Sequence, residues 1–165
     1  MTDAQRLTKY RELVEDIREA MLVTEDQSLG ALRSRPMHTA GVDDDGTLWF
    51  FTKMTADKVQ EIYHERQVNV AYANPEDKQY VSASGPATIV DDPTRKRHYY
   101  SKMMDAWFDG PDDPQATLIK VATEHVEYWD DNDSSLITMA KIALAAVTPG
   151  GDYSGAENER LDLER

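Results

Sequence analysis

Residues 33–58 read RSRPMHTAGVDDDGTLWFFTKMTADK, two β-type runs joined by a turn and followed by the start of a helix. The DDDG segment at 43–46 supplies the turn, because Asp bonds its own backbone and Gly accepts a positive φ. The runs 32–42 and 47–53 are therefore predicted to pair as a hairpin. Four positive side chains lie in this stretch of a protein whose net charge is −13, namely Arg33, Arg35, Lys53 and Lys58. Such a concentration indicates an anion site, with phosphate as the expected anion.

The first run of the hairpin carries two arginines at a spacing of two. The strand period places Arg33, Arg35 and Met37 on one face and Ser34, Pro36 and His38 on the other, so both guanidinium groups can reach one ligand. An alternative stays open, in which the two arginines form a solvated face with acidic partners. His38 is open in the same way, as a general base or substrate contact, or as a structural residue.

Lys58 favours the anion site. It lies in the first turns of a predicted short helix that Thr55 caps, directly after a strand, where backbone N–H groups and a lysine can hold an anion together. Asp57 is placed early enough to favour the positive end of the helix dipole.

The remaining pattern predicts helices punctuating about six mostly antiparallel strands. Apolar spacing predicts a helix from Leu7 to near Glu19, and Gly85-Pro86 predicts a bulge or an edge position in its strand. The predicted strands are 21–24, 32–42, 47–53, 68–73, 79–90 and 118–129, and two further helices are predicted at 94–105 and 136–147. The whole indicates a mainly β, α+β barrel or curled sheet. Residues 1–148 are predicted to form one domain and 149–165 a flexible acidic tail.

Composition excludes several classes of function. A pI near 4.6 argues against a nucleic-acid or anionic-membrane surface, and the absence of cysteine excludes disulfides and thiolate chemistry. No window reaches the length of a membrane span and no export signal is visible, so a cytoplasmic location is expected. The histidines lack metal-binding spacing, and no metal is predicted. Serine-hydrolase, Walker and dinucleotide motifs are absent.

The order RSRPM, then FFT and ADK, then VNVAYANPEDKQYVSASGPATIVDD and EYWDDNDSS, resembles the general stress protein 26 group of the pyridoxamine 5′-phosphate oxidase-like, FMN-binding split barrels. The resemblance covers roughly residues 7–147. It implies a six-stranded antiparallel split β-barrel with flanking helices. It also implies a homodimer with FMN in the cleft between subunits, to which the partner contributes through the strand 79–85 and the Trp129 region.

The resemblance further implies which residues hold FMN. Arg33, Arg35 and Lys58 would bind the phosphate, Pro36 and Met37 would lie along the ring or the ribityl chain, and backbone around Phe51 and Thr52 would meet the ring edge. The full implied set is Arg33, Ser34, Arg35, Pro36, Met37, Phe51, Thr52, Lys53, Asp57, Lys58 and Trp129.

The sequence departs from the true oxidase at two places. His38 stands where the oxidase has a substrate-phosphate lysine, and no Arg-Leu-His-type motif follows Trp129. Pyridoxamine 5′-phosphate oxidation is therefore not expected. Whether the protein is an enzyme stays open between two hypotheses. One is an FMN-dependent oxidoreductase with a reduced nicotinamide or another donor. The other is a non-catalytic protein that stores or senses flavin. Deazaflavin F420 or haem in place of FMN is a third possibility.

Overall fold

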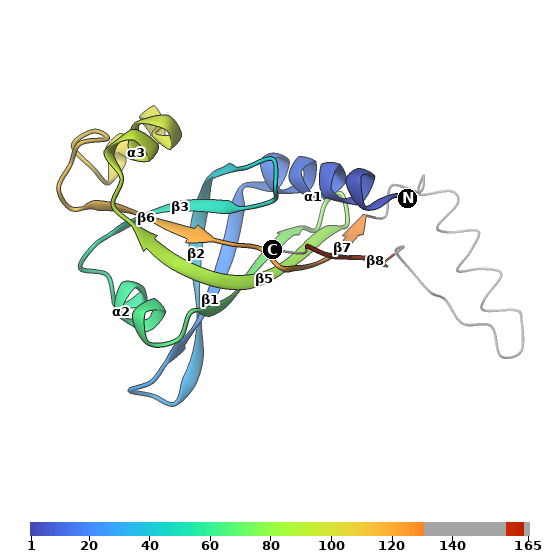
Figure 1. Ribbon diagram of the computed structural model, residues 1–165, viewed down its shortest axis with the longest axis horizontal. Helices are drawn as coiled ribbons and strands as arrows, with labels where there is room; N and C mark the ends of the chain where they lie inside the picture. The colour runs from blue at the N-terminus through green and yellow to red at the C-terminus, as the bar shows by residue number, and fades with distance from the viewer. Residues whose placement is uncertain (131–157, 164–165) are drawn as a thin grey trace, which may run out of the picture.

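The computed structural model describes residues 1–130 and 158–163 (Figure 1). In chain order the elements are α1 (Asp3–Ile17), β1 (Glu19–Asp26), β2 (Ala31–Val42), β3 (Leu48–Lys53), α2 (Asp57–His64), β4 (Gln67–Asn74), β5 (Gln79–Val90), α3 (Pro93–Tyr99), the 3₁₀ helix η1 (Lys102–Ala106), β6 (Ala116–Val121), β7 (His125–Asp130) and β8 (Asn158–Asp162). No helix in these parts of the chain is both long enough and apolar enough to cross a bilayer.

Six strands close into a barrel through antiparallel pairs only. The order around the ring is β4, β1, β2, β3, β6 and β5, and pairing between β4 and β5 closes it. Strands β7 and β8 extend the sheet outward from β5. In Figure 1 the long, curved β5 runs below β6, with α1 and α3 toward opposite ends of the barrel. The six-stranded antiparallel barrel with flanking helices is thus confirmed, as is the hairpin of β2 and β3.

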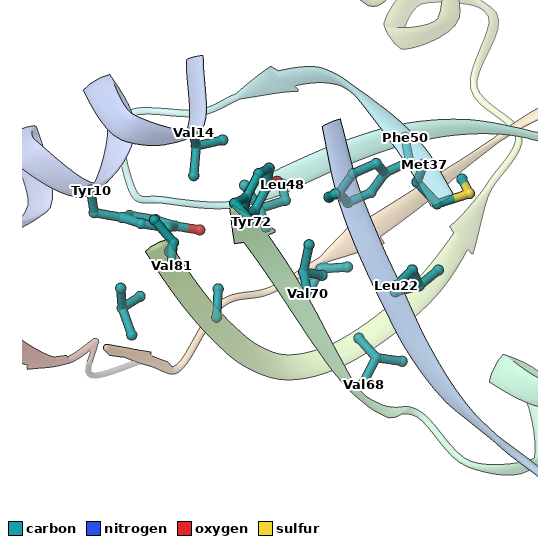
Figure 2. Close-up of a cluster of buried hydrophobic side chains, with 14 of the residues drawn as sticks. Tyr10, Val14, Leu22, Met37, Leu48, Phe50, Val68, Val70, Tyr72 and Val81 are labelled. Carbon is teal, nitrogen blue, oxygen red and sulfur yellow. The ribbon is translucent and has the colours of Figure 1, made fainter. Parts of the chain in front are cut away.

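The barrel interior is apolar, and α1 covers one end of it. Figure 2 shows side chains from β1, β2, β3, β4 and β5 meeting in this interior. Tyr10, Leu13 and Val14 of α1 are buried against them, since the apolar stripe of that helix faces inward. The Tyr10 hydroxyl donates to the carbonyl oxygen of Gly46 at 3.3 Å, which joins α1 to the β2–β3 turn.

The single strand predicted at 118–129 is wrong, because the chain divides there into β6 and β7. Strand β5 pairs with β7 through Gln79–Ser84 and with β6 through Ala87–Val90. The chain must therefore turn between β6 and β7. The Ala122 N–H donates to the Pro86 carbonyl at 3.0 Å. Gly85 lies at this crossing, where an added Cβ would be 2.1 Å from the Ala122 carbonyl oxygen.

Replacing Gly85 with alanine is expected to lower the free energy of unfolding by roughly 1–3 kcal/mol, the usual cost of overpacking. The clashing atom is backbone and cannot rotate away, so the crossing itself must shift. Urea unfolding of Gly85→Ala beside Ser84→Ala measures the effect, and the Ser84 variant is expected to stay close to wild type. A Gly85→Ala variant as stable as wild type would contradict the tight crossing.

The arm that follows β5 packs outside the barrel as a second apolar cluster. Met104 and Phe108 are buried there against Phe51 and Leu118. The helix predicted at 94–105 is divided, because Tyr100 has an extended backbone (φ −70°, ψ 131°) between α3 and η1. Its ring packs edge-on against Phe51, with centroids 5.6 Å apart.

The C-terminal segment differs from the flexible tail predicted for it. Residues 158–162 form β8, which pairs with β7, and Leu161 is buried in the barrel cluster. Leu161 and Leu163 are the only apolar residues of the charged segment 158–165 and give too short an alternation to predict a strand, and the pairing depends on the open edge of β7. The helix predicted at 136–147 lies outside the described residues, as does the rest of the predicted tail.

Candidate functional site

A cavity of about 480 Å³ lies between the β2 and β3 strands on one side and η1 on the other. Its volume is in the range of small-molecule and cofactor sites. The lining residues are Glu19, Pro36, Met37, His38, Phe51, Thr52, Lys53, Ala56, Lys58, Met103, Met104, Trp107 and Phe108. Strands β1, β2 and β3 supply the first seven of these residues, and the segment after α3 supplies the last four.

Lys58 gives the cavity a partly desolvated positive charge. Its ammonium lies 3.3 Å from the Thr52 hydroxyl. Burial, and then the positive charge of Arg35, lower the pKa of Lys58 from its ordinary value. Among the described residues no carboxylate forms an ion pair with it. An anion in the cavity would relieve the repulsion between these two cations.

The start of α2 adds hydrogen-bond donors next to Lys58. The predicted cap at Thr55 is wrong, because the N-cap is Ala56, which has no side chain able to accept a hydrogen bond. Ala56 itself lines the cavity. First-turn N–H groups without a side-chain cap, together with a lysine, suit an anionic group of a ligand.

Arg33 and Arg35 share a face, as the strand period predicts, and both contact Glu61 of α2. One terminal nitrogen of Arg35 donates to the two Glu61 oxygens at 2.6 and 2.5 Å, and the other donates to the Thr24 hydroxyl at 2.5 Å. Arg33 contacts Asp26 at 3.0 Å and Glu61 at 3.4 Å. The acidic-partner alternative is therefore present in the structure, and neither arginine is among the cavity-lining residues.

Asp26 belongs to the same ionic group at the far end of β1. Hydrogen bonds from the Ser28 hydroxyl, and next from Arg33, hold the pKa of Asp26 below its ordinary value. In turn, the hydrogen bond to Asp26 is the main cause that raises the pKa of the Arg33 guanidinium. These groups stabilise one another as ions and fix Arg33 over the β1–β2 turn.

His38 and Glu19 form a pair at another part of the cavity wall. They are cross-strand partners on β1 and β2, and the His38 Nδ1 lies 2.6 Å from a Glu19 oxygen. A carboxylate only accepts hydrogen bonds, so this contact assigns the hydrogen to Nδ1 and leaves Nε2 for another partner.

The segment after α3 forms an apolar wall of the cavity with Met103, Met104, Trp107 and Phe108, and this wall was not predicted from the sequence. Met103 and Trp107 are 44% and 57% exposed, although both side chains are large and apolar. Neither of the other two tryptophans supplies this wall, although the resemblance implies Trp129 as a cofactor contact. Trp49 is instead buried and donates to Asp43 at 2.9 Å, while Trp129 lies on β7 and does not line the cavity.

The cavity thus unites only part of the predicted set. It brings together Pro36, Met37, His38, Phe51, Thr52, Lys53 and Lys58, and its lining leaves out Arg33, Ser34, Arg35, Asp57 and Trp129. The residues that sequence reasoning missed are Glu19, Ala56, Met103, Met104, Trp107 and Phe108. A tryptophan inside the Asp-rich loop sequence DAWFDGPDD was the one available signal. Across residues 1–130 and 158–163, no three His, Asp or Glu side chains form a group able to hold a metal ion.

The cavity has a cation, Lys58, in one part of its wall and the exposed apolar side chains Met103 and Trp107 in another. This arrangement suits a flat ligand that carries an anionic group. The chain is similar to Protein bli-3 of Neurospora crassa, with 27% identity over 139 residues. The alignment covers 78% of this chain and 66% of that protein. It therefore spans just under two thirds of the length of this relative.

Two solved structures share the fold. General Stress Protein 26 of Bacillus anthracis str. Sterne has a TM-score of 0.69 and 23% identity, over 75% of this chain and 93% of that chain. The general stress FMN/FAD binding protein of Xanthomonas citri has a TM-score of 0.68 and 23% identity, over 81% and 93%. The family model described as Pyridoxamine 5′-phosphate oxidase like matches residues 5–152. The chain belongs to this family.

Proposed function

We propose that this protein binds FMN in the cavity between β2, β3 and η1 and acts as a flavin-dependent oxidoreductase. The observation that carries the proposal is Lys58, a partly buried cation beside Arg35 at an uncapped helix start. An anionic phosphate fits that place and the flat ring of a flavin fits the apolar wall. Family membership and the flavin-binding name of the Xanthomonas citri protein support the same cofactor.

In this proposal the phosphate lies at Lys58, with Thr52 and the first-turn amides of α2 as further donors. Arg35 contributes its positive charge from behind Lys58, held there by Glu61, and Arg33 supports that group. Pro36 and Met37 lie along the ring or ribityl chain, and backbone at Phe51 and Thr52 meets the ring edge. The remaining proposed contacts are Ser34, Lys53 and Asp57.

The active form is proposed to be a homodimer whose second subunit completes the site. Trp129 is the cross-strand neighbour of Tyr80, which is 39% exposed, so the two side chains lie on one face of the sheet extension. A partly exposed aromatic pair is suited to contact a second copy. The partner is proposed to contribute through this pair and the strand 79–85.

Bound FMN supplies hydride acceptance and donation, which no side chain can provide. The protein's own residues bind the cofactor, exclude water and orient the substrate. His38 is proposed to contact substrate through Nε2, with Glu19 as the residue that positions the imidazole. The donor is proposed to be a reduced nicotinamide.

Anaerobic mixing of the FMN-loaded protein with NADH or NADPH tests the oxidoreductase proposal. Bleaching of the flavin absorbance is expected, followed by recovery when an electron acceptor is added. If neither nicotinamide reduces a tightly bound FMN, the nicotinamide-dependent form is wrong, and storage or sensing of flavin becomes the better explanation.

The affinity for FMN is expected to fall as the pH rises through the pKa of Lys58. Only the ammonium form attracts phosphate, and burial and Arg35 place this pKa below the ordinary 10.5, so the loss begins earlier than for an exposed lysine. Bound phosphate raises the pKa again, hence binding takes up protons in that window. Titrations at pH values from about 7 upward measure the effect. Lys58→Arg should keep its affinity over this range, and an identical decline in both proteins would contradict the assignment.

A further inference from the structure

We propose that Trp107, supported by Met103, covers one face of the flavin ring and is a cofactor-binding residue of this site. This inference rests on the proposed function. It assigns a contact to the segment after α3, a part of the chain outside the predicted site residues.

The exposure of Trp107 is not that of a loosely packed loop. Its neighbours Met104 and Phe108 are only 4% and 7% exposed and pack in the cluster around Phe51. The backbone N–H of Trp107 donates to the Met104 carbonyl at 2.9 Å. All four side chains line the cavity, but the segment buries Met104 and Phe108 and leaves Met103 and Trp107 exposed.

Polar contacts attach this segment to β6 at one end and close it on itself at the other. Lys96 of α3 is buried and its ammonium donates to Asp91 at 2.7 Å and to the Ala116 carbonyl at 3.1 Å. Beyond η1, the Gly110 N–H donates to the Tyr100 hydroxyl at 3.2 Å, and that hydroxyl donates to Asp105 at 2.7 Å. The indole is therefore attached to a fixed support.

Tyr99 adds a second attachment to the barrel. Its ring stacks on Trp49 with centroids 5.1 Å apart, and its hydroxyl donates to Asp43. Gly41 makes room for this ring, since an added Cβ would lie 2.7 Å from it. The position of Trp107 is thus set before any ligand enters.

A fixed, exposed indole on a cavity wall suits a flat aromatic ligand. Stacking with such a ring removes apolar surface from water and adds the favourable contact of two aromatic faces. Lys58 lines the same cavity and supplies the charge that the phosphate of this ligand needs. A flavin mononucleotide has the ring and the phosphate in one molecule.

Ring contact and phosphate contact are separable, because riboflavin has the ring alone. Trp107→Ala is expected to weaken binding of FMN and of riboflavin by the same factor, about tenfold, whereas Trp107→Phe keeps most of the affinity. A stacked indole also quenches flavin fluorescence, so flavin bound to either variant should fluoresce more than flavin bound to wild type. Tyr63→Ala, which removes an exposed aromatic side chain that does not line the cavity, is the matched control and should keep the quenching.

Acrylamide quenching compares the flavin-free wild type with Trp107→Phe and should show that Trp107 is accessible. A shielded Trp107 would mean that a second copy of the chain covers it, and would overturn the assignment. If Trp107→Ala binds both flavins as tightly as wild type and still quenches their fluorescence, the assignment of Trp107 is wrong, while the proposed FMN site stands. Failure of the wild type to bind FMN would overturn the proposed function and this inference together.

Discussion

Replacing Glu61 with alanine is expected to lower the free energy of unfolding by about 3–5 kcal/mol, the cost of removing one partner from a buried ion pair. The Glu61 side chain is 8% exposed and that of Arg35 is 15% exposed. Without Glu61 the Arg35 guanidinium keeps its charge but loses both of its carboxylate contacts. The Thr24 hydroxyl, which donates to Glu61 at 2.5 Å, loses its acceptor as well. Urea unfolding followed by circular dichroism measures the change.

Two further variants separate lost charge from lost shape. Glu61→Gln keeps the shape and one acceptor oxygen, so it is expected to be less harmful than alanine. A double variant, Glu61→Leu with Arg35→Met, removes both charges and should be more stable than Glu61→Ala, because apolar side chains of similar size can replace a buried pair. A Glu61→Ala protein within about 1 kcal/mol of wild type would contradict the importance of this pair.

Lys58→Ala is expected to weaken FMN binding by about 1.5–3 kcal/mol, the range for a hydrogen bond to a charged group. This corresponds to a loss of roughly 10- to 150-fold in affinity. Riboflavin has no phosphate, so its affinity should barely change. Fluorescence titration of both ligands against wild type, Lys58→Ala and Lys58→Arg measures the effect.

Arg35→Ala is also expected to weaken FMN binding, but through two causes at once. It removes a positive charge near Lys58 and leaves Glu61 without its counter-charge, which disturbs α2 and therefore Lys58 itself. Lys58→Ala is the sharper test. If FMN binds Lys58→Ala as tightly as wild type, the phosphate lies elsewhere.

Local patterns in the sequence predicted much of the barrel. The turn at 43–46 between two β-rich runs identified the β2–β3 hairpin, and the spacing of two placed Arg33 and Arg35 on one face. Lys58 was placed correctly in the first turn of a helix after a strand. Each of these features depends on residues that are close in the chain, where period and turn chemistry decide the structure.

Features that depend on distant residues could not be predicted in the same way. Glu61 comes from α2, and only the tertiary fold brings it to the two arginines of β2. The division of the run 118–129 depends on contact with Gly85, far earlier in the chain. Trp107 belongs to a stretch of turn-forming residues without periodicity, so its place on the cavity wall follows from the fixed path of α3 and η1.

The most direct measurement is a calorimetric titration of the flavin-free, full-length protein with FMN and with riboflavin. The cavity and Lys58 predict saturable binding of one FMN per chain, accompanied by flavin absorbance that remains with the protein, and markedly weaker binding of riboflavin. No binding of FMN would contradict a flavin site in this cavity, and equal affinity for the two ligands would contradict a phosphate site at Lys58.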